Sequence, residues 1–596
     1  MEKSRFGTGF KWIVTCLFFI LYFLYFLSCN RYLLIYHEQI QILRFYRDYF
    51  KEFLSVPGGL MRYAGAFLTQ FYLFPTAGAL IVTLTGLSIF SISLYIFRKH
   101  HLSGVFPALV PALLLAALHS NYLYTLACSL GFVVSLGFFA VYISISNNKL
   151  RYSLGFFGWP FLYFLTGGYA LVSMLLCFFH EWLFRRSSYR LIIASIFPVL
   201  GLLVPYIGSK YIFYINEDIA WTYFLPLLIE GPARYILISL LVYCPMVLII
   251  SRGWLAYSKT GYIKMPLNWK TMAAGTLVIS GLAGWLINNV YDRKTEIWLG
   301  IDHCVQHSDW DGALKLSSIY PGTNRLVIYF TNLALCKTGR MGDRLFHYPQ
   351  AGISGLWLKW ERNGISPFFG GEIFYQLAYT SEAYRWAFEA MVAKGPNPRC
   401  LKRLAITSLV NGDITLARKY LKVLDQSLFY RNWAKHYLKY TDHPELLNED
   451  KEIADKIHFA INTDFMSSRD NSDIRLKQLL ENHSDNRIAF EYLMASMLLE
   501  KNLNGVADNI YRLKELGYKS IPAHYEEALL AYMSYSKVNI VPEGYSISLT
   551  TQNLFAEYAK MFFSLNGNPD MAARAMYSKF GNTYWYYLKF INNQAR

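Results

Sequence analysis

Cysteines are few in this sequence, and the short motifs of the common catalytic loops are missing. The chain has 596 residues and eight cysteines, which form no CxxC pair and no regular spacing. Neither a zinc site nor a disulfide framework is therefore indicated. The sequence also lacks a Walker loop, a GxSxG elbow, an HExxH motif and a GxGxxG turn after a strand. These absences argue against a nucleotide hydrolase, an α/β-hydrolase and a zinc protease.

Acidic residues are scarce, and their scarcity is confined to one half of the chain. Aspartate and glutamate number 40 against 57 lysines and arginines, which gives a net charge of +17. Residues 1–290 carry 21 basic and 8 acidic residues, whereas the remainder is nearly balanced at 36 and 32. The basic excess therefore lies in loops between apolar segments, where it orients helices in a membrane. No nucleic-acid partner is predicted.

Long apolar runs fill the first half of the chain. Hydrophobic residues make up 54% of the sequence and aromatic residues 17%, which is too apolar for an ordinary soluble protein. Nine stretches are long enough to cross a bilayer core of about 30 Å. We predict membrane spans at 12–29, 75–97, 103–119, 122–146, 152–167, 169–184, 189–208, 234–251 and 271–290.

The first span is interpreted as a retained anchor, because the residues after it lack a convincing signal-peptide cleavage site. Basic residues such as Lys99, Lys149 and Arg185 fall in alternate loops, all on one side of the membrane. The positive-inside rule makes that side cytoplasmic. With nine spans, the region after residue 290 lies outside the cytoplasm.

The first extracytoplasmic loop is predicted to contain interfacial helices within residues 39–73. Apolar residues from Ile42 to Leu54 recur at helical spacing opposite a charged face, which is typical of a helix lying in the interface plane. Pro57, Gly58 and Gly59 end this helix, and a second apolar helix follows over about 60–73. The later loop at 209–233 is aromatic-rich and is expected to fold onto the membrane surface.

Residues 291–596 show helical stretches separated by proline and glycine at intervals of about 30 to 40 residues. The clearest unit has a helix after Asn397, an Asn411-Gly412-Asp413 turn and a second helix with the small residue Ala417 at the crossing. This pattern is typical of a tetratricopeptide-like hairpin. The fold class is therefore all-α, with a polytopic helical bundle at 1–290 and an extracytoplasmic helical-repeat domain at 291–596. Stacked hairpins usually leave a concave surface for a partner.

The charged residues of the first loop are candidates for chemistry on a lipid-phosphate substrate. A carboxylate can act as a general base, and arginines can bind phosphate. Glu38 and Asp48 are the candidate catalytic residues, and Arg44, Arg47 and Arg62 the candidate substrate-binding cations. The alternative is a solvated helix face, because Arg44 and Asp48 are four residues apart.

Acidic residues of the second loop lie on the same side of the membrane as Glu38. Glu217 and Asp218 can help to bind substrate by positioning a divalent cation or an acceptor hydroxyl. Loop solubility and helix capping are the alternative explanation, and the simpler one. The cofactor is therefore unknown, with a divalent cation as the open option. His303 and His307 share a helix face, but two histidines are a weak metal signal and we interpret them as ordinary helix surface.

Several segments resemble an uncharacterised family, a domain of unknown function, of multi-pass inner-membrane proteins from Gram-negative bacteria. The similar segments are 36–39, 57–60, 67–71, 332–335 and 338–343. This resemblance implies a bacterial inner (plasma) membrane location and no particular activity. The architecture is also similar to glycosyltransferases of the GT-C type, which use polyprenyl-phosphate sugars. That similarity implies an acidic residue in the first loop, at Glu38 or Asp48, and Glu217 with Asp218 as a second acidic site. The sequence departs from this pattern, since the first loop has no adjacent acidic pair and no WWDYG motif is present.

Two functions are compatible with these features. One is an envelope glycosyltransferase that uses a lipid-linked sugar outside the cytoplasm. The other is a non-enzymatic membrane-anchored scaffold whose repeat domain binds envelope proteins. A transporter is less favoured, because the spans are expected to contain almost no buried ionisable residues and transport pathways usually need some.

The predicted topology can be tested with reporter fusions at Lys99, Gly168 and the C-terminus. We expect a cytoplasmic signal at Lys99 and extracytoplasmic signals at Gly168 and at the C-terminus. A cytoplasmic C-terminus would refute the count of nine spans.

Overall fold

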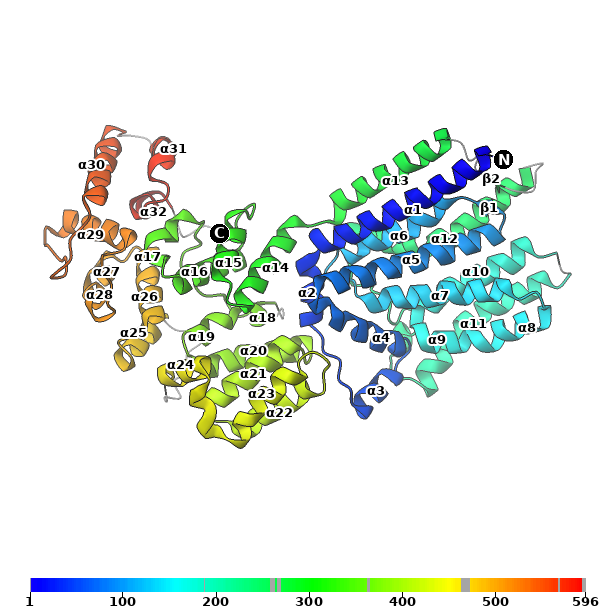
Figure 1. Cartoon of the computed structure of the whole chain (residues 1–596), viewed down its shortest axis with the longest axis horizontal. Coiled ribbons are helices and arrows are strands. Elements are labelled where there is room, and N and C mark those ends of the chain that lie inside the picture. The colour runs from blue at the N-terminus through cyan, green and yellow to red at the C-terminus, as the bar shows by residue number, and fades with distance from the viewer. Residues whose placement is uncertain are drawn as a thin grey trace. The chain divides into compact units, whose positions relative to one another are not determined.

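The structure is a computed structural model that describes residues 2–186, 188–257, 263–264, 269–361, 365–461, 472–565 and 569–591. The described chain is almost entirely helical, which confirms the predicted all-α class (Figure 1). A parallel pair of two-residue strands, β1 (Leu102–Ser103) and β2 (Ile263–Lys264), is the exception among these residues. The chain divides into two compact units, here called the membrane unit and the repeat unit. The membrane unit comprises Met1–Glu296 with Gln426–Phe429, and the repeat unit comprises Ile297–Asp425 with Tyr430–Arg596.

The membrane unit contains seven helices, among the described residues, that are long and apolar enough to cross a membrane. A shorter apolar helix, α6, joins them. The helices of this unit are α1 (Glu2–Ser28), α2 (Arg31–Gln39), α3 (Arg47–Leu54), α4 (Gly59–Thr69), η1 (Gln70–Leu73), α5 (Pro75–Lys99), α6 (Val105–His119), α7 (Leu126–Ser144), α8 (Asn148–Ser153), η2 (Leu154–Gly158), α9 (Trp159–Thr166), η3 (Gly167–Tyr169), α10 (Ala170–Phe179), η4 (His180–Phe184), α11 (Arg190–Tyr211), η5 (Glu217–Ile219), α12 (Pro232–Tyr257) and α13 (Trp269–Val290).

The repeat unit begins within α14, at Ile297, and consists of short helices joined by turns. Its helices are α14 (Arg293–Gln306), α15 (Trp310–Ser318), α16 (Arg325–Lys337), α17 (Met341–Arg344), η6 (Leu345–His347), α18 (Ser366–Gly370), α19 (Glu372–Gln376), α20 (Thr380–Lys394), α21 (Pro398–Val410), α22 (Ile414–Asp425), α23 (Arg431–Asp442), η7 (Pro444–Glu449), α24 (Lys451–Phe459), α25 (Ser472–Asn482), α26 (Arg487–Leu499), α27 (Leu503–Asn509), α28 (Arg512–Glu515), α29 (Ala523–Ser536), α30 (Leu549–Ser564), α31 (Pro569–Phe580) and α32 (Tyr584–Phe590).

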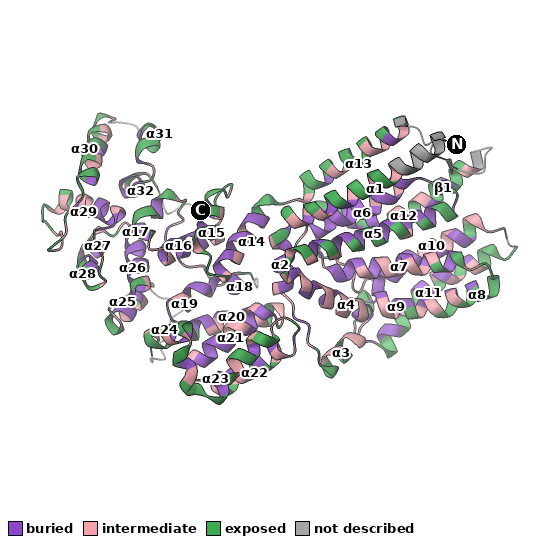
Figure 2. Cartoon of the chain, viewed as in Figure 1, coloured by how far each residue is buried: buried purple, intermediate pink, exposed green. Residues whose placement is uncertain are grey.

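The core of the membrane unit is apolar and lies around α6. This helix is buried along almost its whole length, whereas α13 exposes most of its side chains (Figure 2). Large apolar side chains such as Leu277 and Leu202 are more than 60% exposed on the outer helices. A bilayer is the environment in which exposed leucines on long helices are stable, because lipid tails replace water. The burial pattern therefore fits a membrane bundle.

The apolar segment Asn148–Phe184 reverses direction at Gly167. The backbone of Gly167 has a φ of +56°, a conformation that residues with a Cβ adopt only under strain. The two ends of the segment meet again, because Nε of Arg151 lies 3.1 Å from Oε1 of Glu181. The hydroxyl of Tyr142 donates to the same oxygen at 2.9 Å. The segment is therefore a hairpin of two antiparallel helical arms.

The Arg151–Glu181 ion pair corrects the expectation that the apolar segments hold almost no ionisable residues. Both side chains are 0% exposed. The sequence pattern had counted Arg151 as a loop charge, because it stands at the edge of an apolar run. A buried guanidinium needs a carboxylate partner, and Glu181 supplies it from the other arm of the hairpin.

The first loop is helical, but its boundaries differ from the prediction of helices within 39–73. Helix α2 begins at Arg31, after a gap of two residues that follows the end of α1, and was not predicted as a separate element. Residues 41–46 are not helical, so the amphipathic helix is the shorter α3. The predicted second helix corresponds to α4 and η1. The predicted end at the Pro57-Gly58-Gly59 turn is confirmed, and Gly58 has a φ of +76° there.

The predicted hairpin around Asn411 is confirmed in the repeat unit. Helix α21 begins after Asn397, whose side chain accepts a hydrogen bond from the backbone N–H of Cys400 at 2.9 Å. Gly412 has a φ of +80° in the turn, and Ala417 is fully buried in α22. A small residue at this position lets the two helices approach closely.

Removing the Glu181 carboxylate should destabilise the membrane unit strongly. In Glu181→Ala the buried guanidinium of Arg151 keeps its charge and loses its partner, which costs about 3–5 kcal/mol. The measurement is thermal or denaturant unfolding of the full chain in detergent. Lys51→Ala is the control, because the Lys51–Asp48 pair is exposed and such pairs contribute about 0–1 kcal/mol. Equal stability of the two variants would contradict the role assigned to the pair.

Candidate functional site

The candidate site lies around helix α2. The N-terminus of this helix is capped by a residue from the C-terminal end of the segment that forms the membrane unit. Asn30 occupies the N-cap position of α2 but makes no side-chain capping hydrogen bond. The carboxylate of Glu296 accepts from the backbone N–H of Tyr32 at 2.7 Å and from that of Leu33 at 3.1 Å. Glu296 therefore performs the capping function, and an acidic group at a helix N-terminus is also favoured by the helix dipole.

Burial raises the pKa of Glu296 to about 7, because the desolvation of its carboxyl outweighs the two backbone N–H donors and the nearby Arg31. The cap is therefore a titratable group within the physiological pH range. Its protonation state determines how much charge is placed at the start of α2.

Glu38 and His37 lie at the C-terminal end of α2 and are both buried. Their exposed fractions are 2% and 6%. Helix α2 packs against η1 and α5, so these side chains are enclosed by protein. Burial lowers the pKa of His37 to about 4, so its imidazole is neutral at neutral pH. Glu38 was singled out from the sequence, but its burial was not predicted.

A cluster of polar side chains lies in the interior near His37. Nε2 of His119 is 2.8 Å from the hydroxyl of Ser129, which in turn donates to the hydroxyl of Tyr124 at 3.3 Å. The rings of His119 and Tyr124 are perpendicular, with centroids 5.1 Å apart. Electrostatic interactions connect His119 with His37, and Tyr22 with both Tyr124 and Tyr72. The polar cluster is defined here as Tyr22, His37, Tyr72, His119, Tyr124 and Ser129.

Three polar atoms of this cluster have no hydrogen-bond partner among the described residues. They are Nε2 of His37 and the hydroxyls of Tyr22 and Tyr72. Each parent side chain is less than 9% exposed. Buried polar groups are nearly always hydrogen-bonded, and each exception calls for an explanation such as a ligand or ordered water. The cluster thus has free capacity to bind a polar group.

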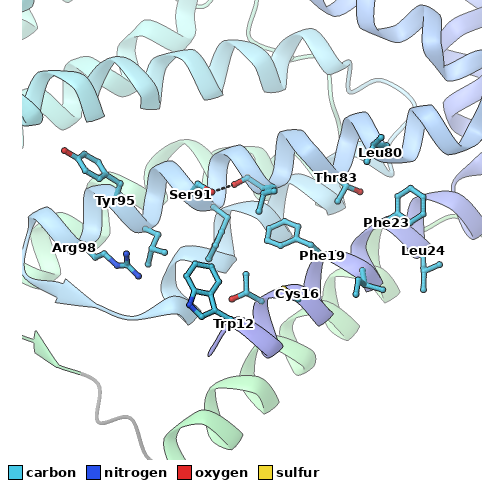
Figure 3. Close-up of a pocket in the computed structure, with 15 residues that line it drawn as sticks. Trp12, Cys16, Phe19, Phe23, Leu24, Leu80, Thr83, Ser91, Tyr95 and Arg98 are labelled. Atoms are coloured by element: carbon cyan, nitrogen blue, oxygen red, sulfur yellow. Dashed lines mark hydrogen bonds between the residues drawn. The ribbon is translucent and has the colours of Figure 1, made fainter. Parts of the chain in front are cut away.

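Two grooves open on the outer face of the membrane unit. One, of about 230 Å³, lies between α1, α6 and α13 and is lined by apolar side chains together with Tyr22, Tyr25 and Ser120. Tyr22 is therefore shared by the lining of this groove and the polar cluster. The other, of about 770 Å³, lies between α1 and α5, with Arg98 at one end and Leu24 towards the other (Figure 3).

The acidic residues predicted with Glu38 occupy a different environment. Asp48 is exposed on α3 and pairs with Lys51 at 2.9 Å. Glu217 and Asp218 are exposed in η5, as is Glu230 before α12. The two loops do meet, since the backbone N–H of Tyr214 donates to the carbonyl of Ser55 at 3.2 Å. The structure thus brings the loops together and leaves these carboxylates in solvent.

Two of the predicted phosphate-binding arginines lie on helices of the first loop, Arg47 on α3 and Arg62 on α4, whereas Arg44 lies in the non-helical segment before α3. Arg44 stacks on the ring of Tyr49 at 4.4 Å, and Arg62 lies 5.9 Å from the ring of Phe53. Arg47 and Arg62 are exposed, and Arg44 is half-buried. The two stacked guanidinium groups are therefore held against aromatic rings at the surface of the loop.

Among the described residues, no third ligand joins His303 of α14 and His307, which directly follows that helix, to form a metal site. The rings of His303 and His307 are 4.2 Å apart. The neighbouring Asp302 is committed to Arg399 through two hydrogen bonds of 2.6 and 2.9 Å. Its carboxylate is therefore already neutralised by a buried guanidinium.

The described chain is helical and contains seven helices that are long and apolar enough to span a membrane, which indicates a membrane protein. The chain belongs to the family of unknown function DUF6057, whose model matches residues 8–591. The predicted membership of an uncharacterised family is thereby confirmed. No curated protein and no solved structure matches the chain.

The raised pKa of Glu296 predicts a pH-dependent stability. The folded state binds the proton of the Glu296 carboxyl more tightly than the unfolded state does. The stability that this proton contributes is therefore complete below about pH 4.5 and is lost as the pH rises through about 7. The free energy of unfolding of the wild type should fall relative to that of Glu296→Gln between about pH 5 and about pH 8, by at most about 3 kcal/mol. Thermal unfolding measures this change as a lower midpoint.

The matched control for this measurement is Glu230→Gln, which changes an exposed carboxylate of the same unit. Its difference from the wild type should not vary over the same pH range. A difference between wild type and Glu296→Gln that is independent of pH would contradict the assignment of the titrating group.

Proposed function

We propose that this protein is a glycosyltransferase of GT-C-like architecture that uses a lipid-linked sugar on the extracytoplasmic side of a bacterial inner membrane. The proposal includes nine spans, a cytoplasmic N-terminus and an extracytoplasmic repeat unit. The hairpin at 148–184 supports the nine-span count, because it divides one apolar run into two arms. The observation that carries the proposal is the buried Glu38, on a helix that begins two residues after the first span.

Glu38 is assigned the role of general base. A neutral hydroxyl is a poor nucleophile, so sugar transfer benefits from a carboxylate that removes the proton of the acceptor. A carboxylate shielded from water suits this task, because a low-dielectric surrounding favours proton uptake. The neutral imidazole of His37 is adjacent in sequence, and the unsatisfied polar atoms of the cluster can hydrogen-bond to sugar hydroxyls.

The groove between α1, α6 and α13 supports a lipid-linked donor. Its apolar walls suit the hydrocarbon chain, and Tyr22 connects it with the polar cluster. The donor phosphate needs cations, which Arg44, Arg47 and Arg62 can supply. Glu217 and Asp218 are the candidates for positioning a divalent cation or the acceptor.

The proposed base can be tested by substitution in a strain that lacks the gene. Glu38→Gln is nearly isosteric and cannot accept a proton, so it should lower the transfer rate by about 100-fold or more and reproduce the glycan profile of the deletion. The measurement is the glycan profile together with protein abundance in the membrane. Asp48→Asn tests the alternative base, and Glu230→Gln is the exposed control.

Full complementation by both Glu38→Gln and Asp48→Asn would reject the catalytic role and favour a second candidate, a membrane-anchored scaffold. That candidate is supported by large apolar side chains exposed on the last helices. Leu549, Phe563, Met571 and Tyr577 are each at least 66% exposed on α30 and α31. Stacked tetratricopeptide-like hairpins would present this surface to an envelope protein.

A further inference from the structure

A cluster of metal-ligating side chains lies in the repeat unit, outside the site described above. His458, His483 and Asp485 each direct one possible ligand atom to a common point, and these atoms all lie within 4.8 Å of one another. No other group of three such residues meets this condition within the described ranges. Nothing in the sequence pattern indicated it, because 24 residues separate the two histidines.

The ends of three helices hold these ligands. His458 is in the last turn of α24, and His483 follows α25, where its backbone N–H donates to the carbonyl of Leu479 at 2.9 Å. Asp485 directly precedes Asn486, whose side chain caps α26 by accepting from the N–H of Ala489 at 3.1 Å. Short, capped connections of this kind restrict where His483 and Asp485 can point.

The side chains of the cluster are already in contact with one another. Nε2 of His458 lies 3.4 Å from a carboxylate oxygen of Asp485, and the rings of the two histidines are 5.2 Å apart. Bond lengths of about 2.0–2.2 Å to a central ion would require these ligand atoms to approach by an ångström or so. All three side chains reach the surface, so rotation of exposed side chains can provide this movement.

We propose that His458, His483 and Asp485 form a zinc-binding site that links the end of α24 to the connection between α25 and α26. Two imidazole nitrogens and one carboxylate oxygen are a donor set that Zn²⁺ binds in tetrahedral geometry, with water in the fourth position. Mg²⁺ and Ca²⁺ prefer oxygen ligands and do not suit two imidazoles. The ion would join two helices through side chains far apart in the sequence, which stabilises the folded repeat unit.

A second exposed histidine, His443, provides a control that has two candidate ligands instead of three. His443 lies 3.1 Å from Glu445, an arrangement like that of His458 and Asp485, but no third ligand joins it among the described residues. This pair is a matched control, because it has the same donor types and similar exposure on the same unit. A general affinity of surface histidines for zinc would affect both places equally.

The test uses the full chain in detergent, stripped of metal with a chelator and titrated with Zn²⁺ by calorimetry. We expect one tight equivalent per chain, and a loss of at least about 10-fold in affinity in both His483→Ala and His458→Gln. Zn²⁺ should also raise the thermal midpoint of the wild type, and a chelator should reverse this shift. His443→Ala should behave as the wild type.

Co²⁺ provides a second readout, because four-coordinate cobalt absorbs visible light strongly. The wild type should show this absorption, and His458→Gln, whose fold is checked by circular dichroism and gel filtration, should not. Wild-type affinity in His483→Ala and His458→Gln, or a chain that binds no Zn²⁺, would overturn the proposal. The readouts are binding and stability, so they are independent of any transferase activity.

Discussion

The hydrogen bonds from the backbone of Tyr32 and Leu33 to Glu296 are the interaction on which the candidate site depends. Residue 296 is separated from residue 32 by 264 positions, so the contact ties the region after the last apolar helix to the region after the first. Without it, the N–H groups at the start of α2 would be left unsatisfied in a buried place, at about 1–3 kcal/mol. The position of Glu38, at the other end of this short helix, follows from that cap.

The membrane unit also shows how charge is kept inside an apolar bundle. Arg151 and Glu181 are both inaccessible, and they neutralise one another across the two arms of one hairpin. The polar cluster near α2 is different, because His37 is neutral and two tyrosine hydroxyls are unsatisfied. The ion pair also leaves Oε2 of Glu181 without a hydrogen-bond partner among the described residues, so an unsatisfied atom alone does not separate the two places. Function is placed at α2 because three side chains of one cluster, His37 beside Glu38 among them, each leave a polar atom unsatisfied there.

Much of the fold was predictable, because apolar runs and helical spacing are local properties of a sequence. The long apolar helices and the hairpin turn at Asn411-Gly412-Asp413 follow from such patterns. The cap by Glu296, the partner of Arg151 and the meeting of His458 with His483 were not predictable, since each joins residues distant in the chain. For the site, Glu38 could be selected from its place after the first span. Its burial, and the exposure of Asp48 and Glu217, depend on tertiary packing that spacing does not encode.

Hydrogen exchange at α2 tests most directly whether Glu296 positions the candidate site. In the full wild-type chain, the amides of Tyr32 and Leu33 should be protected because the carboxylate of Glu296 accepts from both. In Glu296→Ala, protection should fall at these two amides and along α2 as far as Glu38, while α7 stays protected. Equal protection of α2 in the two proteins would contradict the account, because α2 would then be held without the cap.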